Sequence, residues 1–139
     1  MNRIVGADPI PTALARLNAS TVLASALGGT GRVGAKHIPP YPRLRVRATP
    51  GGSDDLTTGV SRVWLRLEAL DSVEAPVGEE QLRHILYVAV SELAELPKQP
   101  TPPGGVVIND VFSRVGGGPS PEADGRPRWA SVVEIVCHA

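Results

Sequence analysis

The chain has 139 residues, with 14 basic and 14 acidic side chains and a formal net charge of zero. A neutral chain is not expected to coat nucleic acid through bulk electrostatic attraction. The hydrophobic fraction of 42% excludes a disordered chain, and no stretch approaches the roughly 20 apolar residues of a membrane span. Cys137 is the single cysteine, so we expect no internal disulfide, no zinc site and no bound cofactor. We also expect no signal peptide, because Met1–Asp8 lacks a basic region followed by an apolar run.

The first predicted element is a helical segment over residues 8–27. Asp8 can cap its start, and Ser20 can cap a second helix where the apolar stripe is interrupted. We therefore expect two short helices, which Gly28 ends. A loop rich in glycine and proline follows over residues 28–42.

Residues 43–70 predict a β-hairpin with a long turn. Polar and apolar side chains alternate over residues 43–48 and again over residues 60–70, which is typical of half-buried strands. The intervening residues 49–59 are polar and contain Gly and Pro, as expected of a turn.

The second half of the chain predicts one long helix and a second hairpin. Residues 79–96 carry apolar side chains at helical spacing, and Pro97 follows them. Residues 106–138 predict two further strands, 106–115 and 128–138, around a second long turn.

These elements predict a single α+β domain over residues 1–139. Its sheet is expected to be four-stranded and mostly antiparallel, built from the two long-looped hairpins. The long helix and the short N-terminal helices are expected to pack on one sheet face. The pattern does not determine the order of the strands.

The charges are segregated along the chain. Five arginines share one face of the first predicted hairpin: Arg43, Arg45, Arg47, Arg62 and Arg66. Acidic residues gather on the long predicted helix: Glu79, Glu80, Glu92 and Glu95. Three interpretations stay open: an interface with the acidic helix of a neighbouring copy, a positive lining beside DNA, or a solvated face paired locally with Glu68 and Glu134.

The segment Gly29–Gly34 matches the pattern G-x-G-x-x-G. A dinucleotide site needs a strand before this pattern and a helix after it, whereas here a predicted helix precedes it and a proline-rich loop follows. His84 has no nucleophile paired with it in the sequence, and no serine lies in a G-x-S-x-G elbow. We therefore expect no catalytic residue, although a nucleotide-binding module or small enzyme stays a distant alternative.

Several sequence features follow one another along nearly the whole chain. They are a helical start ending in Gly28-Gly29 and then Arg32-Val33, the strand Pro40–Val46, the turn Gly51-Gly52 with Asp54-Asp55, the long helix, and Arg128-Trp129-x-x-x-Val133. In this order they resemble the tail terminator proteins of long-tailed (siphovirus-type) actinobacterial bacteriophages. The composition of twelve Arg to two Lys suits phages of GC-rich hosts.

The resemblance implies a structural virion protein that is assembled in the host cytoplasm and is not an enzyme. Family members form a homomeric ring, typically a hexamer, that caps the head-proximal end of the tail tube and stops its polymerisation. Their partners are the tail tube protein and the head-completion or neck protein. DNA passes through the ring without sequence-specific binding, and no membrane is involved.

By position, the resemblance implies two kinds of contact surface. The arginines and the acidic helix are the candidates for contacts between subunits. The residues expected to face the tube or the neck lie in the two long turns: Asp54, Asp55, Gly116, Gly117, Gly118 and Asp124. Another head–tail connector or tail-completion protein is the alternative within the same class.

Overall fold

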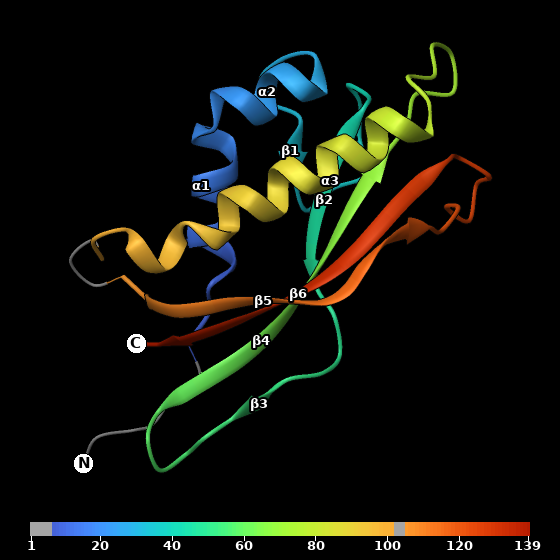
Figure 1. Ribbon diagram of the computed structural model, residues 1–139. Helices are drawn as coiled ribbons and strands as arrows, with labels where there is room; N and C mark the ends of the chain where they lie inside the picture. The colour runs from blue at the N-terminus through green and yellow to red at the C-terminus, as the bar shows by residue number, and fades with distance from the viewer. Residues whose placement is uncertain (1–6, 102–104) are drawn as a thin grey trace.

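The computed structural model describes residues 7–101 and 105–139 and shows an α+β fold, with helices packed on one face of a single sheet (Figure 1). Met1–Gly6, most of the segment in which no signal peptide is expected, lie outside the described residues. The elements in chain order are α1 (Ile10–Ala19), α2 (Thr21–Leu27), β1 (Val33–Gly34), β2 (Arg43–Ala48), β3 (Ser53–Asp54), β4 (Val60–Leu70), α3 (Glu79–Ala94), the 3-10 turn η1 (Leu96–Lys98), β5 (Val107–Pro119) and β6 (Arg128–His138).

The sheet is mixed and has six strands, so the predicted number of four was wrong. The strand order is β1-β2-β4-β6-β5, and β3 pairs with β4 beside this path. Both predicted hairpins are confirmed, because β2 pairs with β4 and β5 pairs with β6, each antiparallel. The hairpins join through β4 and β6, which pair from Val60 opposite His138 to Leu70 opposite Arg128. The extra strands β1 and β3 are two residues long, too short for an alternation signal.

The sequence-based prediction placed the start of the second long turn too early. β5 continues through Gly116–Gly118 to Pro119, so these glycines belong to a strand and not to a turn. Three register shifts interrupt the pairing of β5 with β6, and each disturbs the alternation of side chains. The sequence-based prediction therefore made β5 too short, because its bulges break the two-residue alternation of side chains.

The predicted caps of α2 are confirmed, but the N-cap of α1 is Pro9 and not the predicted Asp8. Ser20 accepts a hydrogen bond from the Leu23 amide through its hydroxyl at 3.0 Å, and Gly28 ends α2 with a positive φ of 87°. Asp8 accepts from the amide of Ile10 at 3.0 Å. α3 ends at Ala94, two residues before its predicted end, because the chain tightens into η1.

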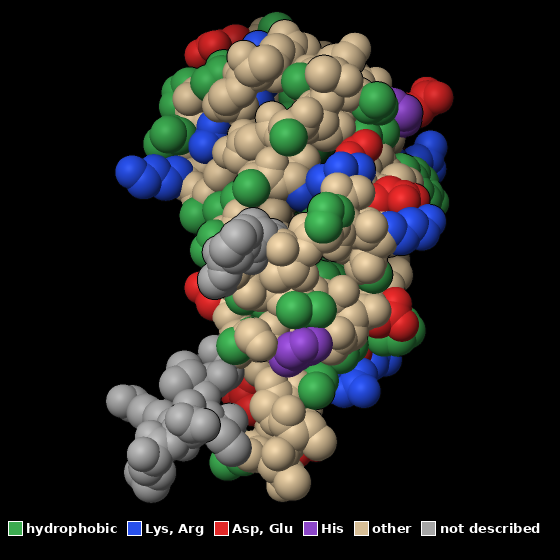
Figure 2. Space-filling view, turned by 90° about the vertical axis from the view of Figure 1, so that its left-hand side faces the viewer, with side chains coloured by type: hydrophobic (Ala, Val, Ile, Leu, Met, Phe, Trp, Pro, Cys, Tyr) green, Lys and Arg blue, Asp and Glu red, His purple; other side chains and the backbone are tan. Residues whose placement is uncertain are grey.

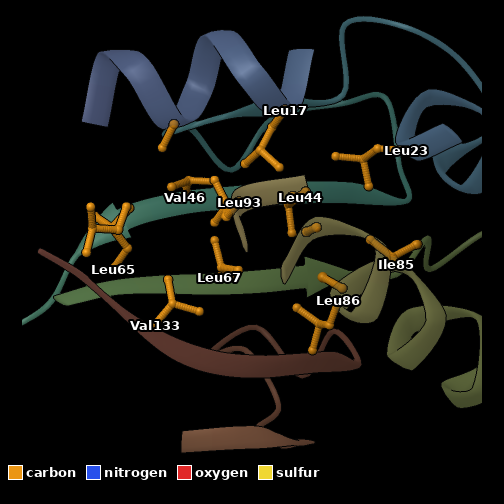
Figure 3. Close-up of a cluster of buried hydrophobic side chains, with 14 of the residues drawn as sticks. Leu17, Leu23, Leu44, Val46, Leu65, Leu67, Ile85, Leu86, Leu93 and Val133 are labelled. Carbon is orange, nitrogen blue, oxygen red and sulfur yellow. The ribbon is translucent and has the colours of Figure 1, made fainter. Parts of the chain in front are cut away.

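The core lies between the helices and the sheet face that they cover. Figure 3 shows Leu44, Val46, Leu65, Leu67 and Val133 of the sheet facing side chains of the helices. The helical partners in this cluster are Leu17, Leu23, Ile85, Leu86 and Leu93. All these side chains are buried. Within residues 7–101 and 105–139, the opposite face of the sheet carries no helix (Figure 1).

One buried carboxylate organises the segment between β4 and α3. Asp71 accepts hydrogen bonds from the amides of Ser72, Val77 and Gly78 at 2.7, 2.9 and 3.2 Å. Its own carbonyl accepts from the Arg126 guanidinium at 2.6 Å. These hydrogen bonds therefore fix the path of this loop into α3.

Candidate functional site

The sheet face turned away from the helices carries a network of arginines and glutamates. We call it the arginine face. Arg45 lies opposite Glu68, whereas their neighbours Leu44 and Ala69 point to the core. Strand alternation thus places the polar residues of β2, β4 and β6 together on this face. Its charged members are Arg43, Arg45, Arg47, Arg62, Arg66, Arg114, Arg128, Glu68 and Glu134.

Glu68 is the centre of the larger of two clusters. Its side chain is fully buried, and Arg45 binds it at two points, with Nε at 2.9 Å from Oε1 and Nη2 at 3.2 Å from Oε2. Three more arginines approach the same carboxylate: Arg47 at 2.8 Å, Arg66 at 3.2 Å and Arg128 at 2.6 Å. Burial raises the pKa of Glu68, but the hydrogen bonds from Arg45 and the nearby positive charges outweigh it and hold that pKa below its usual value.

Glu134 is the centre of the second cluster. It is 2% exposed and accepts from Arg114 at 2.7 Å, from Arg62 at 3.3 Å and from the indole nitrogen of Trp64 at 2.9 Å. Burial again raises the pKa of this carboxyl, and the hydrogen bonds from Arg114 and Trp64 reverse the shift. Gly51 packs against Trp64 so closely that a Cβ there would lie 2.1 Å from the indole ring.

The loop between β5 and β6 covers part of the arginine face. Glu122 of this loop accepts from Arg45 at 2.9 Å and from Arg128 at 2.6 Å. Arg126 stacks over the ring of Tyr41 at 3.8 Å, and Asp124 lies 3.4 Å from His37. This loop therefore contacts the segment before β2 and buries Glu68.

The predicted arginines fall into two groups. Arg43 and Arg45 are 6% and 8% exposed, and Arg43 donates to the carbonyls of Lys36 and Gly31. Arg47 and Arg62 keep side-chain exposures of 49% and 48%, and Arg114 keeps 45%. The expected local pairs with Glu68 and Glu134 are confirmed, but the centre of the face is buried and not solvated.

The arginine face carries more positive than negative charge. Six arginines share the three carboxylates of Glu68, Glu122 and Glu134. On the side of the molecule that Figure 2 presents, basic and acidic side chains are likewise interspersed, and no large patch of one sign is visible. The face is thus an interlocked network whose surplus charge reaches solvent through Arg47, Arg62 and Arg114.

The acidic residues predicted on the long helix lie on α3 and just after it, on the other side of the sheet. Glu79 and Glu80 are exposed in the first turn of α3. Glu92 pairs with Arg16 of α1 at 2.9 Å, and Glu95 pairs with Lys98 at 3.2 Å. Glu79 and Glu80 are therefore the acidic residues of this set for which the structure gives no ion pair among the described residues.

The predicted loop residues lie in three different places. Asp54 and Asp55 are exposed at the end of the β3–β4 hairpin, and hydrogen bonds from the amides of Thr58 and Thr57 lower the pKa of Asp55. Gly116, Gly117 and Gly118 line the edge strand β5, and Asp124 lies in the loop over the arginine face. The two long turns therefore do not form one common surface.

The Gly29–Gly34 segment follows a helix, as the sequence predicts. It leaves α2 and enters β1, the reverse of the strand-to-helix order of a dinucleotide site. The guanidinium of Arg32 donates to the carbonyls of Leu27 and Tyr41, at 2.8 and 2.9 Å, and so fills the turn. Across residues 7–101 and 105–139, no group of acidic, His and Cys side chains has the arrangement of a metal site.

Within the same described ranges, no helix is long and apolar enough to cross a membrane. Comparison with known proteins adds no relative: no protein-family model matches this chain, and no curated protein matches it.

Four side chains of the site were not singled out as site residues in the sequence. Arg114 and Glu122 lie in a bulged strand and a loop, where no periodicity indicates a face. Trp64 and Arg128 alternate with core residues along their strands. This alternation was enough to predict their position on the arginine face.

Proposed function

We propose that this chain is a structural virion protein, a tail terminator whose copies form a homomeric ring at the head-proximal end of a phage tail tube. In this role the ring stops polymerisation of the tube and offers a joining surface to the neck. Support comes from the order of elements along the chain, which resembles that family, and from the distribution of charge.

The observation that carries the proposal is the separation of opposite charges across one sheet. Arg47, Arg62 and Arg114 expose positive charge on one side, whereas Glu79 and Glu80 expose negative charge on the helical side. The sheet keeps these two surfaces apart within one chain. The positive surface of one copy is complementary in charge to the negative surface of another copy. Such a head-to-tail contact is heterologous, and it closes into a ring when the rotation between copies permits.

The internal network suits a subunit that acts by shape and not by chemistry. The buried pair of Arg45 and Glu68 ties β2 to β4, and Glu122 ties the β5–β6 loop to β2 through Arg45 and to β6 through Arg128. A rigid face of this kind presents its exposed arginines in fixed positions. Fixed positions reduce the entropy that binding removes.

Cross-linking of purified virions, followed by mass spectrometry, tests the proposal. We expect cross-links from this chain to the tail tube protein and to a neck protein. Cross-links to the portal-side connector alone would favour the alternative of a head–tail connector. Absence of the chain from purified virions would contradict both assignments.

A further inference from the structure

The hairpin of β3 and β4 ends in a structured turn that projects an apolar side chain. We call residues 54–58 the arm tip. Leu56 at its apex is 67% exposed, although it is a large hydrophobic residue. The turn is held by the Asp55 carboxylate, which accepts from the amides of Thr57 and Thr58 at 2.9 and 3.2 Å. Figure 1 shows β3 and the start of β4 running away from the helices, so none of the described helices covers this tip.

A small apolar groove lies between α3 and β5. We call it the α3 groove, and it is lined by Arg83, Leu86, Tyr87, Val90, Ser113, Gly116, Gly117 and Ser131. Its volume is about 120 Å³. An apolar cavity of about 150 Å³ accommodates one benzene molecule, so this groove has the size for one aliphatic side chain. Tyr87 on its rim is 68% exposed, and aromatic residues are enriched in protein interfaces.

Two glycines of β5, Gly116 and Gly117, line the groove and place no side chain in it. A Cβ at Gly117 would lie 3.4 Å from Leu86 and 3.7 Å from the indole ring of Trp129. Any side chain there would occupy the space beside α3. The glycines were expected to lie in a turn, and their place in β5 gives them this second role.

The arm tip cannot reach the α3 groove of its own chain. Ser131 lines the groove and pairs with Leu67, whereas the arm begins at Val60, which pairs with His138. Seven residues of β4 separate the two positions, a distance of about 23 Å at ~3.3 Å per residue. A leucine side chain does not span this distance, so any contact between the two features joins different copies.

The charges around the two features are complementary. Asp54 and Asp55 directly precede Leu56 on the arm tip. Arg83 on the groove is exposed and stacks over Trp129 at 5.7 Å, with no described carboxylate within ion-pair distance. The arm tip therefore combines one apolar side chain with two neighbouring carboxylates, and the groove combines an apolar lining with one guanidinium at its rim.

We propose that the arm tip of one copy docks in the α3 groove of the next copy, with Leu56 in the groove and the arm carboxylates beside Arg83. This inference rests on the proposed homomeric assembly and identifies one of its contacts. Because the tip and the groove are different surfaces, the contact repeats from copy to copy and does not pair two copies symmetrically.

Disulfide trapping of the full chain tests this contact. The variant carries Leu56→Cys with Tyr87→Cys, and the matched control carries Val73→Cys with Tyr87→Cys, because Val73 is 64% exposed and lies in another loop. Native Cys137 is buried and its pKa is raised to about 11, so it does not compete under mild oxidation. We expect a ladder of covalent multimers from the first variant and background from the control.

A charge exchange provides a second measurement. Arg83→Asp should weaken self-association several-fold in sedimentation, and adding Asp54→Arg should restore most of the loss. Cross-linking no stronger than the control, at every concentration tested, would overturn the inference. If that result accompanies an intact oligomer, it contradicts the docking contact but not the proposed ring. Absence of the chain from virions would instead contradict the proposed function.

Discussion

Arg45 and Glu68 form a two-point ion pair between adjacent strands, with both side chains buried. Arg47, Arg66 and Arg128 also approach this carboxylate, so four guanidinium groups share its single negative charge. Burying any of these groups alone is costly, and only their mutual contacts make the arrangement stable.

Replacing the central carboxylate should therefore destabilise the fold. Glu68→Gln keeps the shape of the side chain but leaves the buried Arg45 and Arg128 to share one remaining carboxylate, that of Glu122. We expect a loss of about 3 kcal/mol in the free energy of unfolding, measured by urea denaturation. Glu74→Gln, at an exposed position, is the control and should leave the midpoint unchanged. An unchanged midpoint for Glu68→Gln would contradict this role.

The same carboxylates predict acid sensitivity. The folded-state pKa values of Glu68 and Glu134 lie below the reference value of 4.5, because bonds from arginines outweigh the effect of burial. Their stabilising contribution is complete above about pH 4.5 and is lost as the pH falls through the lowered folded-state values. Urea midpoints measured from about pH 7 to about pH 3 should fall on the acid side. The slope should be shallower in Glu134→Gln, and equal slopes would speak against the assignment.

The contact of Gly51 with Trp64 predicts a marked difference between two glycines. Gly51 has a φ of 136° and no room for a Cβ, whereas Gly59 has a φ of 75° and nothing within 4 Å of its position. Gly59→Ala should cost about 1 kcal/mol through backbone strain alone. Gly51→Ala should cost more and should shift tryptophan fluorescence, because Trp64 must move from Glu134. Equal effects of the two substitutions would refute this packing.

Removal of exposed positive charge should weaken assembly without unfolding the chain. Arg47→Gln and Arg114→Gln each leave their carboxylate with other arginines. We expect the pair of substitutions to weaken self-association several-fold at low salt, with less effect at high salt where charges are screened. Lys98→Gln, on the helical side, is the matched control. Arg45 is unsuitable for this test, because its buried guanidinium also holds the fold together.

Sequence reasoning predicted the local elements better than their assembly. Alternation in residues 43–48 and 60–70 and the caps at Ser20 and Gly28 each depend on neighbouring residues, and the structure confirms them. The pairing of β4 with β6 joins residues about 70 positions apart, and no local pattern determines it.

The candidate site shows the same division. The sequence placed Arg45 and Glu68 on one face, but it did not indicate that the β5–β6 loop covers them. That loop brings Glu122 across the sheet and buries groups that alternation alone assigned to solvent. A charged residue on the outer face of a strand is therefore exposed only when nothing distant in the chain folds over it.

Electron cryomicroscopy of the virion tests the central claim most directly. The account predicts a closed homomeric ring of this chain between the last ring of tail tube protein and the neck, with the fold described above fitting each subunit. A neck reconstruction whose ring densities do not accommodate this fold would contradict the account.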